Sequence, residues 1–238
     1  MTGHSMTRRE LIRMTGGLLA TPVPAPGDRL LPGWHGLGTG GERDGVVGMP
    51  AASGPRPLIV MLHGAGGTGR RAARLLAPAA DEAGYIVLAP DSRGATWDAI
   101  TGPFGPDVAF VSQAIALILA RCEVDPGRVA LAGFSDGATY ALALGRANGD
   151  RFGRLLAFSP GFLIPARPIG TPAIFIAHGR GDEILPIDRC SRKLVPALRR
   201  QGYRVRYREF EGRHELPAAV AREALAWLDE RGTDADPG

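Results

Sequence analysis

The stretch that decides the fold is RVALAGFSDGATYALALGRANG, residues 128–149. It opens with RVALA, a mostly apolar run without polar alternation, which is typical of a strand buried on both faces of a parallel sheet. Residues 136–148 then carry apolar side chains at helical spacing, and Gly149 marks the end of that helix. Between them lies GFSDG, residues 133–137, which predicts a tight link from a buried strand to a helix.

The same strand-and-helix unit repeats on both sides of this stretch. We expect further strands at residues 58–62, 85–89, 155–158, 173–177 and 203–210, and helices at 70–83, 108–122, 188–201 and 218–230. Alternation of this kind predicts an α/β fold with a mostly parallel central sheet and helices on both faces. The last strand alternates with arginines, as suits an edge position, and residues 43–50 offer a short antiparallel strand at one edge.

Composition divides the chain into a packed domain and an irregular first quarter. Glycine and proline are concentrated in the first quarter, so we assign 56–232 to one folded domain, 28–55 to an irregular segment with the edge strand, and 233–238 to a tail. Within residues 1–27, TRRELIR (7–13) resembles a twin-arginine export signal, which predicts a periplasmic or extracellular protein. A disordered first segment in a cytoplasmic protein is the alternative.

The overall composition is that of an ordinary globular protein. The chain has 238 residues, of which 45% are hydrophobic and 22% charged, and this excludes disordered chains, fibres and disulfide-stapled miniproteins. No uncharged apolar run is long enough to span a membrane. The net charge is +4, but acids are interleaved with the arginines, so we predict no nucleic-acid partner. Cys122 and Cys190 fall on different parts of the expected sheet, and we expect two free, inert thiols.

In a parallel α/β sheet, the chemistry is carried by loops that follow the strands. Ser135 stands in such a loop, and a serine hydroxyl becomes a nucleophile when a base takes its proton and a third group orients the base. His214 follows the last strand and comes after every candidate acid, so it is the candidate base. His63 and His178 each precede a glycine at a strand end, and we expect both to be structural, bonded to loop carbonyls.

The candidate acid lies in HGRGDE, residues 178–183, after the penultimate strand. Asp182 stands in a glycine-rich turn, which lets a short side chain approach an imidazole. Glu183 is the second choice, and Asp188 fits the N-cap of the next helix better. The chain order Ser135, Asp182, His214 is the one expected when a serine in a strand–turn–helix link belongs to a catalytic triad.

A second glycine-rich loop, HGAGG (63–67), follows the strand at 58–62. Its backbone N–H groups, above all that of Ala65, would stabilise a developing oxyanion together with the N–H of Asp136, the residue after the serine. A phosphate cradle is the rival interpretation, but the loop lacks the lysine of the P-loop pattern, so we predict no nucleotide. We also predict no metal and no other cofactor.

Taken together, LHGAGG (62–67), GFSDG (133–137), HGRGDEILP (178–186) and GRHE (212–215) resemble the α/β-hydrolase family. Residues 56–229 are similar to its phospholipase/carboxylesterase branch, which is related to polyhydroxybutyrate depolymerases and feruloyl esterases. The resemblance implies a serine carboxylic-ester hydrolase without a cofactor. It carries over Ser135, Asp182 and His214 as the triad, and Ala65 and Asp136 as oxyanion donors. Asp136 departs from the glutamine usual in acyl-protein thioesterases of this branch, and its carboxylate would have to turn away or pair, for example with an arginine.

The proline-rich connection at residues 159–171 is too short for the helical lid of many lipases, which predicts an open site without a lid domain. Such a site suits short-chain or aryl esters, and polyesters if the protein is exported. The candidates for lining the pocket are Trp97, Phe134, Phe162 and Leu185, with Trp97 covering the core as the alternative. A serine peptidase of the same fold and a catalytically silent binding protein are the alternative functions. The natural ester and the oligomeric state stay open.

Overall fold

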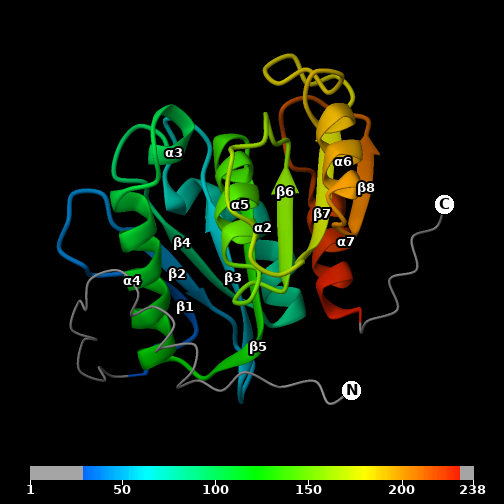
Figure 1. Ribbon diagram of the computed structural model, residues 1–238. Helices are drawn as coiled ribbons and strands as arrows, with labels where there is room; N and C mark the ends of the chain where they lie inside the picture. The colour runs from blue at the N-terminus through cyan, green and yellow to red at the C-terminus, as the bar shows by residue number, and fades with distance from the viewer. Residues whose placement is uncertain (1–28, 231–238) are drawn as a thin grey trace.

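The computed structural model describes residues 29–230, and these form one eight-stranded sheet (Figure 1). The strand order is β1-β2-β4-β3-β5-β6-β7-β8. Neighbours from β4 to β8 pair in parallel, whereas β2 pairs antiparallel with both β1 and β4. The strands are β1 Gly33–Gly36, β2 Gly45–Met49, β3 Arg56–Leu62, β4 Ile86–Pro90, β5 Val124–Phe134, β6 Arg154–Phe158, β7 Ala173–Gly179 and β8 Val205–Phe210. The carboxyl ends of the parallel strands therefore share one edge, at the top of Figure 1.

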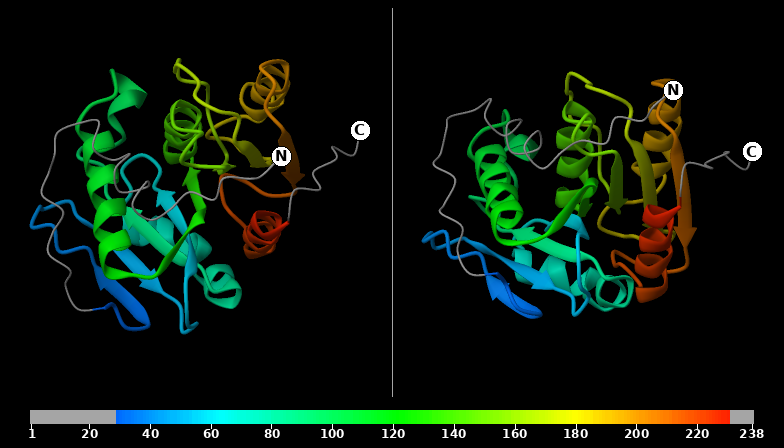
Figure 2. Two further views of the ribbon diagram at one scale, coloured as in Figure 1. Left: turned by 60° about the horizontal axis from the view of Figure 1, so that its bottom comes forward. Right: turned by 90° about the horizontal axis from the view of Figure 1, so that it is seen from below.

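Helices cover both faces of this sheet. One layer contains α4, α5 and α6, and the other contains α2 and α7 (Figure 2, left). The short helix α3 lies between β4 and α4. The helices are α2 Gly69–Ala83, α3 Asp98–Thr101, α4 Pro106–Arg121, α5 Asp136–Ala147, α6 Ser191–Arg200 and α7 Ala218–Asp229.

Alternate residues of the central strands point into two separate cores. In β3, Leu58, Val60 and Leu62 belong to the core beneath the α4–α5–α6 layer, while Ile59 and Met61 belong to the core beneath α2 and α7. All five side chains are fully buried, which explains why β3 reads as an unbroken apolar run. Burial of each such side chain contributes about 1.5–3 kcal/mol. The two cores therefore hold in place the sheet edge that carries the site.

The predicted α/β class is confirmed, and so is the edge position of the last strand, β8. Residues 28–55 were expected to supply one strand at the edge of the sheet. They supply two strands: β2 lies inside the sheet, and β1 pairs with its outer side and forms the edge. The Trp34 ring packs on Gly48, where an added Cβ would come within 2.6 Å of the ring. Short strands that contain glycine have little intrinsic β-propensity, so the pairing alone reveals this hairpin.

The start of α6 corrects one expectation. Asp188 is not the N-cap: the helix begins at Ser191, after Cys190. The N–H groups of Arg189 and Cys190 both donate to the Pro186 carbonyl, so the preceding residues form a separate turn. The Asp188 carboxylate accepts instead from Arg192 at 2.8 Å. Cys122 and Cys190 are both buried and form no disulfide, as predicted.

The connection between β6 and β7, residues 159–172, contains neither helix nor strand, in agreement with the absence of a lid predicted for this part of the chain. No helix in the described range 29–230 is both long and apolar enough to cross a membrane. The predicted export signal at residues 1–27 and the predicted tail at 233–238 lie outside the described residues.

Candidate active site

Ser135 links β5 directly to α5 at the carboxyl edge of the sheet. Its φ of 57° lies in the left-handed region, which serine rarely adopts. A Cβ on Gly133 would lie 2.1 Å from the Gly137 carbonyl oxygen, and a Cβ on Gly137 would lie 2.2 Å from the Leu62 carbonyl oxygen. The two glycines of GFSDG therefore permit the sharp turn and the close contact between α5 and β3, and this packing holds the strained serine in place.

We expect Gly137→Ala to lower both the stability of the protein and the activity of this site. The new methyl group would overlap the Leu62 carbonyl, so β3 or α5 must shift, at a cost of about 3 kcal/mol. For a chain of this size the Tm should fall by about 6–12 °C. Gly94→Ala is the control, because a Cβ there would meet nothing closer than the Thr96 oxygen at 3.5 Å. Equal Tm values for the two variants, measured by circular dichroism, would contradict this account.

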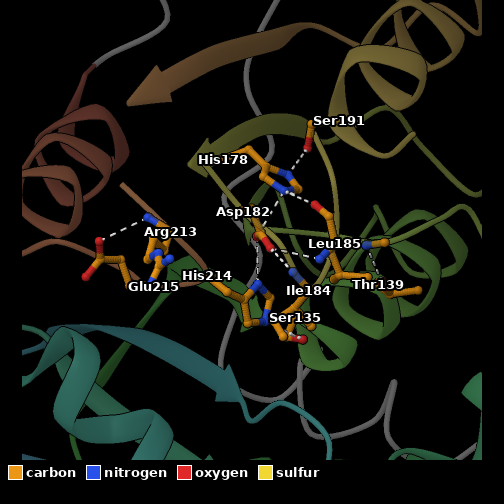
Figure 3. A network of polar contacts seen from close by, with 11 residues as sticks. Ser135, Thr139, His178, Asp182, Ile184, Leu185, Ser191, Arg213, His214 and Glu215 are labelled. Atoms are coloured by element: carbon orange, nitrogen blue, oxygen red, sulfur yellow. Dashed lines mark hydrogen bonds and ion pairs between the residues drawn. The ribbon is translucent and has the colours of Figure 1, made fainter. Parts of the chain in front are cut away.

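The three residues predicted as a triad meet at this edge, although each follows a different strand (Figure 3). His214 Nε2 lies 3.0 Å from Ser135 Oγ, and His214 Nδ1 lies 2.7 Å from Asp182 Oδ2. A carboxylate can only accept, so Nδ1 of His214 carries the proton and donates it to Asp182. In the neutral ring, Nε2 is then unprotonated and faces the serine hydroxyl. The arrangement is therefore able to move a proton from Ser135 to His214.

Asp182 is held as a carboxylate by several donors. Its Oδ1 accepts from the amides of Ile184 at 3.0 Å and Leu185 at 2.8 Å, and its Oδ2 accepts from His214. Burial by itself would raise the pKa of Asp182, but the hydrogen bonds from His214 and from the Leu185 amide outweigh it and hold the pKa below its usual value. A negative charge fixed in this way would stabilise an imidazolium at His214.

The HGAGG loop lies against the serine, since an added Cβ on Gly64 would be 3.1 Å from the Ser135 Cβ. The Gly64 carbonyl accepts from His63 Nδ1 at 2.7 Å and from the Gly67 N–H at 3.0 Å. Because the peptide is trans, the Ala65 N–H points away from that carbonyl. Within residues 29–230, the Ala65 N–H has no acceptor, and this N–H is left available as a donor.

The N–H of Asp136 opens helix α5 and likewise has no acceptor within the described part of the chain. Its side chain turns to Thr96, whose hydroxyl donates to Asp136 Oδ2 at 2.7 Å. The partner is thus a hydroxyl group, not the arginine suggested from the sequence. Thr96 stands in the loop after β4, forty residues before Asp136, and no local pattern signals the contact.

The four predicted pocket residues have different surroundings. Trp97 is 0% exposed, stacks on Tyr140 and donates to the His63 carbonyl at 2.7 Å, so the pocket role was wrong and the core alternative is confirmed. The Phe134 ring lies 4.8 Å from the His214 ring, centroid to centroid. Phe162 is 45% exposed, and Leu185 packs near Gly161 between the loops that follow β6 and β7. Phe134, Phe162 and Leu185 stay candidates for contacting a substrate.

The two histidines predicted as structural do bond to loop carbonyls. His63 Nδ1 donates to Gly64, its Nε2 accepts from the Ser92 N–H at 2.9 Å, and burial lowers the pKa of its ring. His178 Nε2 donates to the Leu185 carbonyl at 2.8 Å. The sequence analysis missed a further contact of His178, with Asp182 Oδ2 at 3.2 Å. Its only trace in the sequence is a histidine four residues before the candidate acid.

The rival acids are engaged elsewhere. Glu183 is exposed and pairs with Arg213 at 3.0 Å. Asp188 pairs with Arg192, as described above. Within residues 29–230, no group of three or more histidine, cysteine or acidic side chains is arranged to hold a metal ion. Asp182 is therefore the carboxylate that the fold brings to His214.

A family model described as the alpha/beta hydrolase family matches residues 59–237, most of the chain. The chain belongs to the alpha/beta hydrolase family. NocK of Nocardia uniformis subsp. tsuyamanensis, whose designation as an esterase is itself an inference, is 30% identical to this chain over 152 residues. The match covers 59% of this chain and 44% of NocK, so the chain spans less than half the length of that relative.

Several solved structures share the fold of this alpha/beta hydrolase. FphF, a fluorophosphonate-binding serine hydrolase of Staphylococcus aureus, superposes with a TM-score of 0.66 at 14% identity, covering 83% of this chain and 99% of its own. Esterase PE8 gives a TM-score of 0.63 at 22% identity, covering 77% and 96%. An S-formylglutathione hydrolase from Agrobacterium tumefaciens gives 0.60 at 18% identity, covering 82% and 93%. At such identities the likeness establishes the fold.

Proposed function

We propose that this alpha/beta hydrolase is a serine carboxylic-ester hydrolase that acts through an acyl-enzyme. The observation that carries the proposal is the unbroken chain of hydrogen bonds from Ser135 Oγ through the His214 ring to the buried Asp182 carboxylate. The strained serine backbone, which only close packing maintains, adds support because such strain concentrates at functional sites. The resemblance to the phospholipase/carboxylesterase branch and the esterase designation of NocK point to the same chemistry.

The mechanism uses the groups already described. His214 Nε2 removes the Ser135 proton as Oγ attacks the ester carbonyl, and the Asp182 carboxylate stabilises the imidazolium that forms. The N–H groups of Ala65 and Asp136 donate to the oxyanion of the tetrahedral intermediate. His214 then protonates the leaving alcohol. In the second half, His214 activates water, which attacks the acyl-enzyme and regenerates Ser135.

The surroundings of the site favour short-chain or aryl esters. No helix stands between β6 and β7, where it could cover a long acyl chain, and Phe162 in that connection is 45% exposed. Phe134 lies against the His214 ring and would offer an apolar contact to an acyl or aryl group. Without a helix above the site, a long acyl chain would stay largely in contact with water and would gain little from binding.

Hydrolysis of p-nitrophenyl acetate, butyrate and octanoate tests the proposal. We expect turnover of the two short esters, with a lower kcat/KM for octanoate, and loss of activity after labelling with a fluorophosphonate. Mass spectrometry should place the label on the peptide that contains Ser135. A well-folded protein that hydrolyses none of the three esters and takes up no label would contradict the proposal, and would leave the silent binding protein as the better interpretation.

A further inference from the structure

His178 is buried beside Asp182, and the steps proposed for the triad do not use it. It lies at the end of β7 and is 0% exposed. Its Nδ1 is 2.7 Å from Ser191 Oγ, and its Nε2 is 2.8 Å from the Leu185 carbonyl oxygen and 3.2 Å from Asp182 Oδ2 (Figure 3). The buried ring thus approaches the same oxygen of the candidate acid that accepts from His214.

The neighbours of the ring determine where its proton lies. A carbonyl oxygen can only accept, so Nε2 must carry the hydrogen that points to Leu185, and this nitrogen lies 3.2 Å from Asp182 Oδ2. Nδ1 is then an acceptor, and the Ser191 hydroxyl donates to it. Burial lowers the pKa of His178, and the nearby His214 lowers it further when that ring is charged, which keeps His178 neutral. The Nε2–H of His178 therefore bonds to the Leu185 carbonyl and brings its polar hydrogen close to Asp182 Oδ2, with Nε2 at 3.2 Å from that oxygen, without adding a positive charge.

His178 approaches Asp182 Oδ2, the oxygen that also accepts the hydrogen bond from His214. Asp182 Oδ1 accepts from the amides of Ile184 and Leu185, so the direction of Oδ2 depends on how the turn and its own neighbours hold the carboxylate plane. Oδ2 is held by His214 at 2.7 Å and by His178 at 3.2 Å. The His214 side chain is 17% exposed and must follow the proton from serine to leaving group, whereas the fully buried His178 ring stays in place.

We propose that His178 is a positioning residue, which fixes the orientation of the Asp182 carboxylate through Nε2 and so keeps His214 aligned with Ser135. The inference rests on the proposed function of the triad. The same Nε2–H also donates to the Leu185 carbonyl, and the Leu185 amide donates to Asp182, so one ring ties the turn at residues 182–185 to the carboxylate it carries. Misplacement of a catalytic group by even about 1 Å costs up to about 100-fold in rate.

Two amide variants separate this role from simple packing. The glutamine amide in His178→Gln reaches the position of Nε2 and still donates toward Asp182, whereas the asparagine amide in His178→Asn reaches only the position of Nδ1 and keeps the bond to Ser191. With p-nitrophenyl butyrate, we expect His178→Asn to lower kcat about 10- to 100-fold with KM within about twofold of wild type. His178→Gln should retain kcat within about threefold.

Ser191→Ala is the matched control, because it removes the hydrogen bond at the other ring nitrogen and keeps the contact with Asp182. It should lower the Tm but keep kcat within about threefold of wild type. Equal kcat values for the asparagine and glutamine variants, or a loss that falls entirely on KM, would overturn the proposal.

A spectroscopic readout makes the test independent of ester hydrolysis. The proton shared by His214 Nδ1 and Asp182 should give a low-field resonance in wild type, in His178→Gln and in Ser191→Ala. It should move upfield or vanish in His178→Asn. An inactive wild type that shows this pattern would reject the proposed function and support the positioning role, and an unchanged resonance in His178→Asn would reject the positioning role.

Discussion

Ser135→Ala should lower kcat for p-nitrophenyl butyrate by about 10⁴- to 10⁶-fold, the largest effect expected of any single substitution in this protein. The variant has no Oγ to attack the carbonyl, and His214 Nε2 then faces an empty position at the end of its ring. The oxyanion donors are backbone groups and stay in place, so a small residual rate above that in water should persist. Initial rates at saturating substrate measure the change.

Ser159→Ala is the matched control for this variant. Ser159 follows the neighbouring strand β6, is fully buried, and also has a positive φ, of 50°. Its hydroxyl has no hydrogen-bond partner within the described residues. Loss of that hydroxyl should therefore leave kcat within about twofold of wild type. An equal loss of activity in both variants would contradict the assignment of the nucleophile to the Ser135 hydroxyl.

Asp182→Asn should lower kcat by about 10⁴-fold with little change in KM. An asparagine amide that donates toward His214 would force Nδ1 to accept, which places the ring proton on Nε2. Nε2 would then point a hydrogen at Ser135 and be unable to take its proton. The loss is in the chemical step, so Michaelis–Menten analysis should assign nearly all of it to kcat.

Glu183→Gln tests the second candidate acid under the same conditions. Glu183 is the adjacent residue, but its carboxylate is exposed and pairs with Arg213. Exposed pairs of this kind contribute about 0–1 kcal/mol to stability, so the variant should keep both its Tm and its kcat. A loss of kcat in Glu183→Gln as large as that in Asp182→Asn would mean that the carboxylate contacts of the structure do not describe the working site.

Much of the fold follows from patterns that span a few residues. The run at 58–62 and the glycines of GFSDG predict a buried strand and a strand-to-helix turn, because burial on both faces and the lack of a Cβ are local demands on residue type. The candidate site is also largely predictable. Chemistry collects at the carboxyl ends of parallel strands, so locating the strands limits the choice to Ser135, three histidines and the acids of one loop. The histidines are His63, His178 and His214, and the chain order then favours His214.

Which of two similar residues in one loop enters the site depends on contacts with distant segments, and only the tertiary structure decides these contacts. Asp182 and Glu183 are adjacent in the chain, yet one meets His214 and the other meets Arg213, since the turn after β7 directs the two side chains differently. The burial of Trp97 against Tyr140 depends equally on where distant elements pack.

The same holds for the pairing of Asp136 with Thr96 and for the approach of His178 to Asp182 Oδ2. A pattern of residue types specifies which face of an element is buried and where the chain can turn. The direction of a polar side chain at a loop is set by a few hydrogen bonds to segments brought near by folding. The sequence by itself therefore determined the parallel part of the sheet, the turn and the candidate serine and histidine, and the packed structure decided which carboxylate lies against that histidine and what holds it.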